Sequence, residues 1–184
     1  MNTSTTDNDS PPDHDDRLRV SPATYTKGGY IRFGRYASGE IAMEILDEAD
    51  EPQCVATVSL VPYGAPHPGK YGVWLKGWFE NEGVPRALVD AGIVTLTGRR
   101  HLTGHAEAEH AELTERARAA LDSRRRNLAS AAHREVDALC SIGIIDAPQA
   151  EVLKRLLTAE AVEQHDQDGM SISDIVDMYR DLTE

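Results

Sequence analysis

The side chains best suited to chemistry follow one another in the stretch Glu80-Asn81-Glu82-Gly83, shortly after Lys76. Two carboxylates, an amide and an amine that converged in a cleft would suit a small ligand-binding or hydrolytic domain. The sequence shows no nucleophile–base pair beside them, and no CxxC, HExxH or glycine-rich phosphate loop. We therefore expect no catalytic residue, no cofactor and no enzymatic activity, and the ligand-binding or hydrolytic domain is an alternative hypothesis.

A second pattern, His101, His105 and Glu109, has the i, i+4, i+8 spacing of metal ligands on one helical face. Gly104 interrupts this run, in a link before the helix that we expect to be irregular. Polar residues are also common where a helix begins. We therefore expect no metal site here.

Several arginines could line up as a basic stripe that neutralises phosphates: Arg99, Arg100, Arg116, Arg118, Arg124, Arg125 and Arg126. Acidic residues interleave with them, and Glu112 stands one helical turn before Arg116, which is a favourable pairing. A solvated helix face is the favoured interpretation. A nucleic-acid-binding regulator is a further alternative.

The net charge of −12 is concentrated at the two ends of the chain. Residues 1–16 contribute −5 and residues 159–184 contribute −7, so the part between them is neutral. An inhibitor that mimics DNA would carry negative charge over its folded surface, so this distribution disfavours mimicry. Because acidic ends also repel phosphate, we do not expect nucleic acid as a partner.

Trp74 and Trp78 are the most informative pair, because only 5% of the chain is aromatic. The period of two in this stretch puts both on one strand face, with Val73, Leu75 and Phe79 on the other. Exposed tryptophans often mark interfaces. We expect the helical tail to cover Trp74 and a partner to cover Trp78. The expected binding residues are Trp74, Lys76, Trp78, Glu80, Asn81 and Glu82.

The local sequence also predicts the elements that position these residues. A helix is expected over residues 84–91, with Asn81 as its cap, Pro85 in its first turn and Gly92 after its end. The pattern predicts an α+β fold, with a small antiparallel sheet of about four strands and one short helix. Strands are expected over residues 29–36, 40–46, 53–60, 73–80 and 93–96, the second and third forming a hairpin.

A helical region follows the sheet. Residues 106–140 contain no proline or glycine and carry a helical apolar stripe, which predicts one long helix, or two with a break near Asp122. Asp146 begins a second helix, and Ser171 begins a third with Asp174 at capping-box spacing. Homo-oligomers could form through these helices. The expected organisation is a disordered acidic tail (1–20), an α+β domain (21–104) and a helical C-terminal region of three helices (105–184).

Compartment can be inferred from composition. Cys54 and Cys140 lack metal-site spacing and are expected to be reduced and buried. No apolar run approaches the roughly 20 residues of a membrane span. The polar, acidic N-terminus lacks the pattern of a signal peptide. We expect a cytoplasmic protein without a membrane partner.

The segments GEIAMEILDEADEPQCVATVSL and VWLKGWFENEGVPRALVDAGIV together resemble an uncharacterised family of small proteins carried by phages, plasmids and conjugative elements. The resemblance spans about residues 28–98 and centres on a K-x-W-x-E-N-E-G segment. It implies an accessory protein of a mobile element. The matching residues are Pro52, Thr57, Val58, Lys76, Trp78, Glu80, Asn81, Glu82, Gly83, Leu88, Gly92 and Ile93.

The leading hypothesis combines this resemblance with the missing catalytic pattern. We expect a non-enzymatic accessory protein of a phage or mobile element that binds and modulates a host protein. An inhibitor of host defence, such as an anti-CRISPR or anti-restriction protein, would fit that description.

Overall fold

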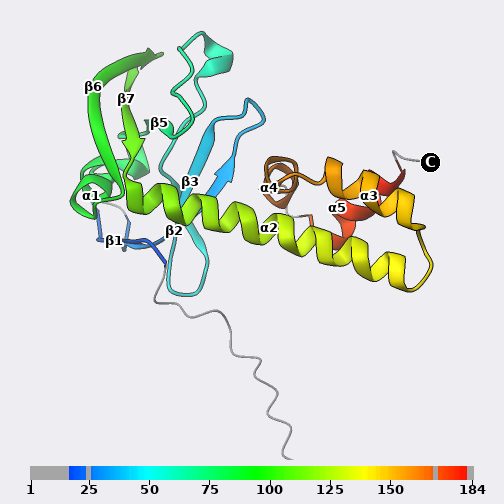
Figure 1. The fold of residues 1–184 in the computed structure, drawn as a ribbon. Coiled ribbons are helices and arrows are strands. Elements are labelled where there is room, and N and C mark those ends of the chain that lie inside the picture. The colour runs from blue at the N-terminus through cyan, green and yellow to red at the C-terminus, as the bar shows by residue number, and fades with distance from the viewer. Residues whose placement is uncertain (1–16, 24–25, 168–169, 182–184) are drawn as a thin grey trace, which may run out of the picture.

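The α+β class predicted from the sequence is confirmed in the computed structural model, which describes residues 17–23, 26–167 and 170–181. Two antiparallel sheets form one end of the molecule (Figure 1). A long helix, α2 (Glu115–Ser141), runs from these sheets to a group of shorter helices. Residues 1–16 of the predicted acidic tail lie outside the described residues.

The first sheet has the strand order β1-β2-β3-β4, and each neighbouring pair is antiparallel. The predicted hairpin is confirmed as β3 and β4. Its turn is held by the Asp47 carboxylate, which accepts hydrogen bonds from the backbone N–H groups of Ala49 and Glu51. The four strands are β1 (Arg19–Val20), β2 (Gly29–Arg35), β3 (Ile41–Leu46) and β4 (Pro52–Val55).

The second sheet has the order β5-β7-β6, with β5 (Gly72–Leu75), β6 (Val94–Thr103) and β7 (Ala106–Leu113). The segment after β4 joins the two sheets. The backbone N–H of Ala56 donates to Met43 O at 2.8 Å, and the N–H of Lys76 donates to Ala56 O at 2.9 Å. The two sheets are therefore linked through the chain between β4 and β5.

The predicted start of the long helix at residue 106 is wrong, because residues 106–113 form strand β7. This strand lies in the middle of the second sheet and pairs with both β5 and β6. The sequence AEAEHAEL is rich in helix-forming residues, but pairing with two strands outweighs that intrinsic preference. The expected helical region 105–184 thus begins with a strand.

Helix α2 begins where Thr114 caps it, accepting a hydrogen bond from the backbone N–H of Ala117. It continues without a break at Asp122. At 27 residues it is about 40 Å long, so its two halves pack in two separate apolar clusters. Its first half packs Ala117 and Leu121 against the sheets, and its second half belongs to the helical cluster.

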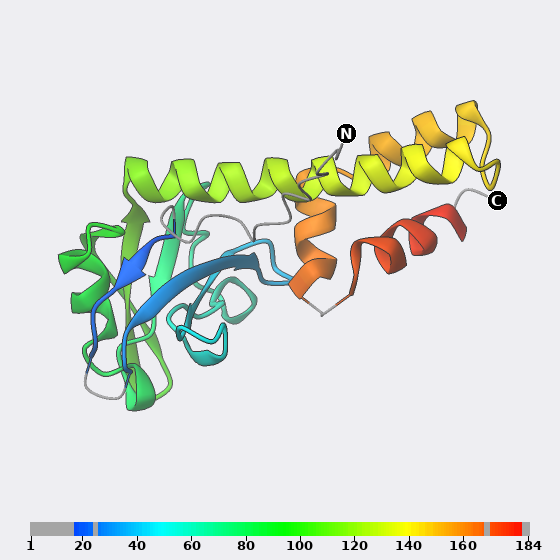
Figure 2. The same ribbon diagram turned by 90° about the horizontal axis from the view of Figure 1, so that it is seen from below.

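The helical end contains α3 (Ala147–Leu156), α4 (Ala159–Gln167) and α5 (Ile172–Asp181) beside α2, so the described part of the tail has four helices and not three. Asp146 caps α3 in a complete capping box with Gln149. The expected contact at the start of α5 is confirmed, since the Asp174 N–H donates to Ser171 Oγ at 3.1 Å. Figure 2 shows α4 crossing between α2 and the end of β2.

The N-terminal boundary predicted at residue 20 also needs correction. Leu18 and Val20 are buried in the sheet cluster, and β1 pairs with β2, so residues 17–20 belong to the fold. Cys54 is buried as expected, whereas Cys140 is only half-buried, and both thiols are free. Among the described residues, no helix combines the length and apolar character that crossing a bilayer requires.

Candidate functional site

Trp74 is buried inside the sheet region, where only 2% of it is exposed. Its indole Nε1 donates a hydrogen bond to the carbonyl of Pro66 at 3.3 Å, and its ring packs against Leu60 and Ala65. The loop after β4 therefore covers Trp74. The expectation that the helical tail covers it was wrong, because α2 packs elsewhere on the sheets.

The period of two that predicted the orientation of Trp78 ends earlier than expected. Strand β5 stops at Leu75, and Gly77 separates it from the short 3-10 helix η3 (Phe79–Asn81). Trp78 is half-buried and packs against the cluster around Trp74. Phe79, which was expected to share a strand face with Val73 and Leu75, is 79% exposed, whereas those two residues are buried.

Phe79 also has an unusual backbone conformation, with a φ of 54°. Left-handed backbone costs an L-residue about 1–2 kcal/mol, and a bulky aromatic residue there is a true outlier. The turn around it is fixed on both sides. The N–H of Asn81 donates to Trp78 O at 3.1 Å, and the N–H of Glu82 donates to Phe79 O at 3.1 Å.

Asn81 anchors this turn to the first sheet and does not cap the following helix, α1 (Val84–Asp90), as predicted. Its side chain is fully buried, and Nδ2 donates to the backbone carbonyl of Val55 at 2.6 Å. The N-cap of α1 is Gly83, whose φ of 82° suits glycine. The prediction that Gly92 follows the end of α1 is confirmed, and the φ of Gly92 is 65°.

The predicted binding residues therefore divide by accessibility. Trp74 and Asn81 are buried, Lys76 and Trp78 are half-buried, and Glu80 and Glu82 are exposed. Lys76 Nζ forms an ion pair with Glu80, and that hydrogen bond lowers the pKa of the Glu80 carboxyl. Because the Asn81 amide points inward to Val55, the proposed convergence of Lys76, Asn81 and Glu82 in a cleft is not found.

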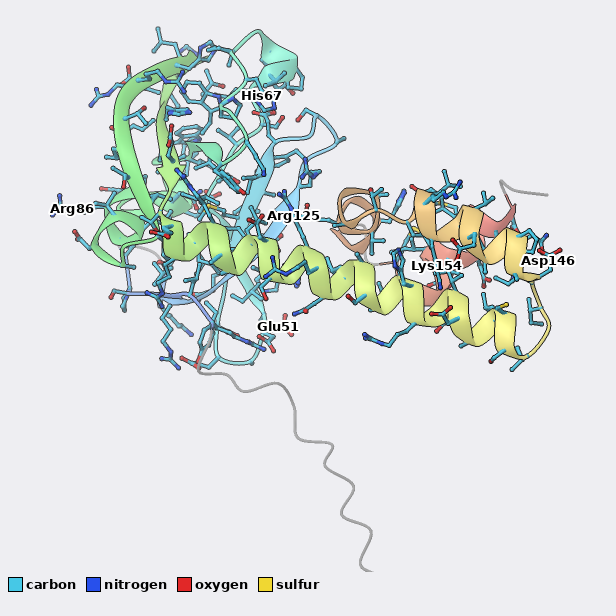
Figure 3. All side chains as sticks on the ribbon, in the orientation of Figure 1. Glu51, His67, Arg86, Arg125, Asp146 and Lys154 are labelled. Atoms are coloured by element: carbon cyan, nitrogen blue, oxygen red, sulfur yellow. The ribbon has the colours of Figure 1, made fainter. Side chains whose placement is uncertain are left out.

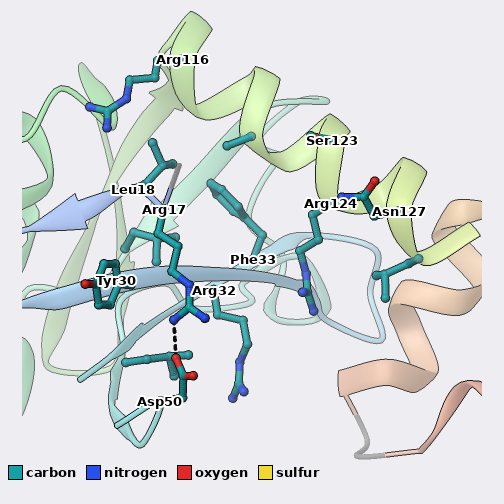
Figure 4. Close-up of a pocket in the computed structure, with 14 residues that line it drawn as sticks. Arg17, Leu18, Tyr30, Arg32, Phe33, Asp50, Arg116, Ser123, Arg124 and Asn127 are labelled. Carbon is teal, nitrogen blue, oxygen red and sulfur yellow. Dashed lines mark hydrogen bonds and ion pairs between the residues drawn. The ribbon is translucent and has the colours of Figure 1, made fainter. Parts of the chain in front are cut away.

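A groove lies between α2 and the first sheet, with a volume of about 830 Å³ (Figure 4). Four arginines line it: Arg17, Arg32, Arg116 and Arg124. Its apolar lining consists of Leu18, Ile31, Phe33, Leu46, Ala120 and Leu128. The sequence analysis named Arg116 and Arg124 as part of a possible basic stripe, but nothing in the sequence indicated that Arg17 and Arg32 lie beside them, because the lining comes from segments far apart in the chain.

The arginines that were considered as one basic stripe are mostly dispersed, although Arg116 and Arg124 both line the groove. Arg100 forms ion pairs with Glu107 and Glu109 on the neighbouring strand. Arg118 pairs with Glu112 at 3.0 Å. Arg125 points from α2 into the protein, between the two ends of the molecule, and is buried (Figure 3). The surface ion pairs of Arg100 and Arg118 contribute little to stability. Their acidic partners also reduce the positive electrostatic potential that a phosphate would meet.

The spacing of His101, His105 and Glu109 rested on a helix that is absent. These residues lie on β6, in the hairpin turn and on β7, and Glu109 pairs across the ladder with Arg100. Within the described part of the chain, no group of three or more His, Cys, Asp or Glu side chains could hold a metal ion.

His110 on β7 is a buried polar residue that the sequence did not single out. The β6 strand bulges opposite it, so that Thr97 Oγ1 lies 2.8 Å from His110 Nδ1 and the Arg99 guanidinium contacts Nε2. Nε2 also lies 2.9 Å from the carbonyl oxygen of Pro68. Burial lowers the pKa of His110, and the charge of Arg99 adds to that effect.

The chain was compared with models of known protein families, with curated protein sequences and with solved structures, and none of the three comparisons returned a match. The resemblance to mobile-element proteins stays a prediction from residues 28–98. A function for the chain therefore has to be argued from the two surfaces described above, the turn of residues 76–82 and the arginine-lined groove.

Proposed function

We propose that this chain is a non-enzymatic binding protein that contacts another protein through the turn of residues 76–82, with Phe79 as the anchor. A single observation carries the proposal. Phe79 is 79% exposed, although its backbone is held in the left-handed region with a φ of 54°. The left-handed backbone destabilises the fold, and the exposed aromatic ring contributes almost no burial to offset that cost.

Backbone strain of this kind persists where the surrounding structure imposes it, and it is concentrated at functional sites. Here the buried Asn81 side chain and the ion pair of Lys76 with Glu80 hold the turn in place. A rigid, outward-pointing aromatic residue loses little entropy on binding. Such residues are typical hot spots when they fill a pocket on a partner.

The charges beside Phe79 indicate what the partner surface would be like. Glu80 and Glu82 follow Phe79 in the same turn and are both exposed, while Lys76 neutralises Glu80 in part. An apolar pocket bordered by basic groups would complement this turn. The same segment resembles mobile-element proteins, which favours a host protein as the partner that carries this pocket. Binding would then modulate host defence.

Capture of partners from a bacterial lysate by the tagged chain, followed by mass spectrometry, tests the proposal. We expect Phe79→Gly to lose the partner that the unmodified chain retains. Tyr63→Ala is the matched control, because Tyr63 is 80% exposed and belongs to a different 3-10 helix, η2 (Val61–Tyr63). It should retain the same partner.

A stability measurement on the same variants separates binding from folding. Glycine relieves the left-handed strain but frees the unfolded chain, so Phe79→Gly should leave the free energy of unfolding unchanged or raise it by up to about 1 kcal/mol. A variant that keeps every partner of the unmodified chain would refute the proposal. So would a variant that loses its partners because it has unfolded, since Phe79 would then be a structural residue.

A further inference from the structure

We propose that the groove between α2 and the first sheet, lined by Arg17, Arg32, Arg116 and Arg124 and here named the arginine groove, binds an acidic segment of a protein partner. That segment would place an apolar side chain on the floor of the groove and its carboxylates against the guanidinium groups. This site is separate from the turn that carries Phe79, and neither proposal depends on the other.

The floor of the arginine groove is apolar and partly accessible. Leu18, Phe33 and Leu46 are buried beneath it. Ala120 and Leu128 on α2 are half-buried and contribute accessible apolar surface. A volume of about 830 Å³ accommodates a few side chains of a bound segment. Apolar surface that is still in contact with water gains free energy when a partner covers it.

The charge of the lining is strongly one-sided. The lining contains four arginines and one acidic residue, Asp50, which pairs with Arg17 at 2.5 Å (Figure 4). Arg32 pairs with Glu44, which is not part of the lining. A guanidinium has five N–H donors, and these pairs occupy only one or two on each. Donors therefore remain for the carboxylates of a bound segment.

Arg116 is the clearest anchor for such a carboxylate. It is exposed on the first turn of α2, and it forms no hydrogen bond or ion pair within the described chain. The other groups that face the groove from α2 near it, Ala120 and Ser123, are uncharged. An incoming carboxylate would thus meet Arg116 without competition from a neighbouring acid.

An acidic peptide fits these features better than a nucleic acid does. Phosphates would use the arginines but not the apolar floor. The part of the chain between residues 17 and 158 is neutral, and the sequence beyond it is acidic, so the chain lacks the basic excess typical of nucleic-acid-binding proteins. Charge complementarity with apolar contact is typical of peptide recognition.

Fluorescence anisotropy with the full-length chain tests this inference. The probe is a labelled peptide of about twelve residues in which glutamates alternate with leucines. We expect saturable binding that weakens as salt is added. A peptide with glutamine in place of glutamate, and one with serine in place of leucine, should each bind at least about tenfold more weakly.

Substitutions in the groove locate the binding. Arg116→Glu reverses an unpaired charge and Ala120→Glu places an acid on the floor, and each should weaken binding at least about tenfold. The matched control is Arg155→Glu, which reverses an exposed charge on α3, and it should bind within about twofold of the unmodified chain. Circular dichroism spectra should be the same for all variants, and two groove positions are used so that one folding defect does not decide the test.

Three results would overturn the inference. One is the absence of peptide binding, or binding that Arg116→Glu and Ala120→Glu leave unchanged while the variants remain folded. Another is tighter binding of an oligothymidine of about twelve nucleotides that is lost in Arg116→Glu. The third is a gain of at least about tenfold in peptide affinity when the acids of the N-terminal segment are changed to asparagine, because the chain itself would then be the occupant. Those acids are Asp7, Asp9, Asp13, Asp15 and Asp16.

Discussion

Nε of Arg125 on α2 donates a hydrogen bond to the buried carboxylate of Glu163 on α4, with 3.0 Å between the two atoms. The Nε of Arg35, at the end of β2, donates to the same carboxylate oxygen at 3.2 Å. One buried oxygen atom therefore joins the sheet, the long helix and the helical end of the chain. These two hydrogen bonds link α4 to both α2 and β2.

Glu163→Ala should lower the free energy of unfolding by about 3–5 kcal/mol. The substitution leaves the charge of Arg125 buried without its partner, and an uncompensated buried charge is far more costly than the pair. Urea denaturation followed by circular dichroism measures the change. Glu151→Ala removes an exposed carboxylate from α3 and serves as the control, with an expected effect below about 0.5 kcal/mol. Equal effects of the two substitutions would show that the contact adds nothing.

The parts of the fold that local chemistry determines could be predicted from the sequence. The cap at Asp146, the proline and glycine that bound α1, and the hairpin of β3 and β4 all depend on residues close together in the chain. Strand β7 could not be predicted in this way. Its Ala-Glu sequence favours a helix, and it becomes a strand because β5 and β6 flank it.

The candidate site was only partly predictable for a similar reason. The K-x-W-x-E-N-E-G segment drew attention to the turn, but the period of two was extended past Gly77, where the strand has already ended. Phe79 is therefore exposed, although the period of two placed it on the same strand face as Val73 and Leu75, which are buried. The arginine groove combines Arg17 with Arg116, which are 99 positions apart, and only the tertiary packing brings them together.

Leu18→Ala should destabilise the protein by about 2–4 kcal/mol, because Leu18 is 3% exposed and packs in the sheet cluster. The sequence predicted a disordered tail over residues 1–20. The burial of Leu18 places the start of the folded part before residue 20 instead. Thermal and urea unfolding measure the change, with Ser21→Ala as the control because Ser21 is exposed one residue beyond β1. Unchanged unfolding of Leu18→Ala would restore the original boundary.

The two tryptophans should differ in their access to solvent although they belong to one cluster. Trp78→Phe leaves Trp74 as the only indole, and its emission should be blue-shifted and resist quenching by acrylamide, because it is 2% exposed. Trp74→Phe leaves the half-buried Trp78, whose emission should be quenched more strongly. Emission spectra and quenching constants of the two variants check this. Equal quenching would mean that the loop after β4 does not cover Trp74.

The stability of the protein should fall as the pH drops below the ordinary histidine pKa of about 6.5. His110 has a lowered pKa in the folded chain, because it is buried beside Trp74 and next to the Arg99 guanidinium. Below pH 6.5 the unfolded chain therefore binds a proton that the folded chain excludes. Folding loses up to about 1.4 kcal/mol per pH unit until the folded pKa is reached.

Urea unfolding at several pH values between 8 and 5.5 measures this dependence. His110→Gln should reduce the slope below pH 6.5, since the residue that takes up the proton is gone, although the variant is less stable at pH 8 because its contacts with Thr97 and Pro68 change. His105→Gln is the control, because His105 is exposed in the β6–β7 turn and should leave the slope as it is. A slope that persists in His110→Gln would assign the pH dependence to other groups and leave His110 with a purely structural role in holding Pro68.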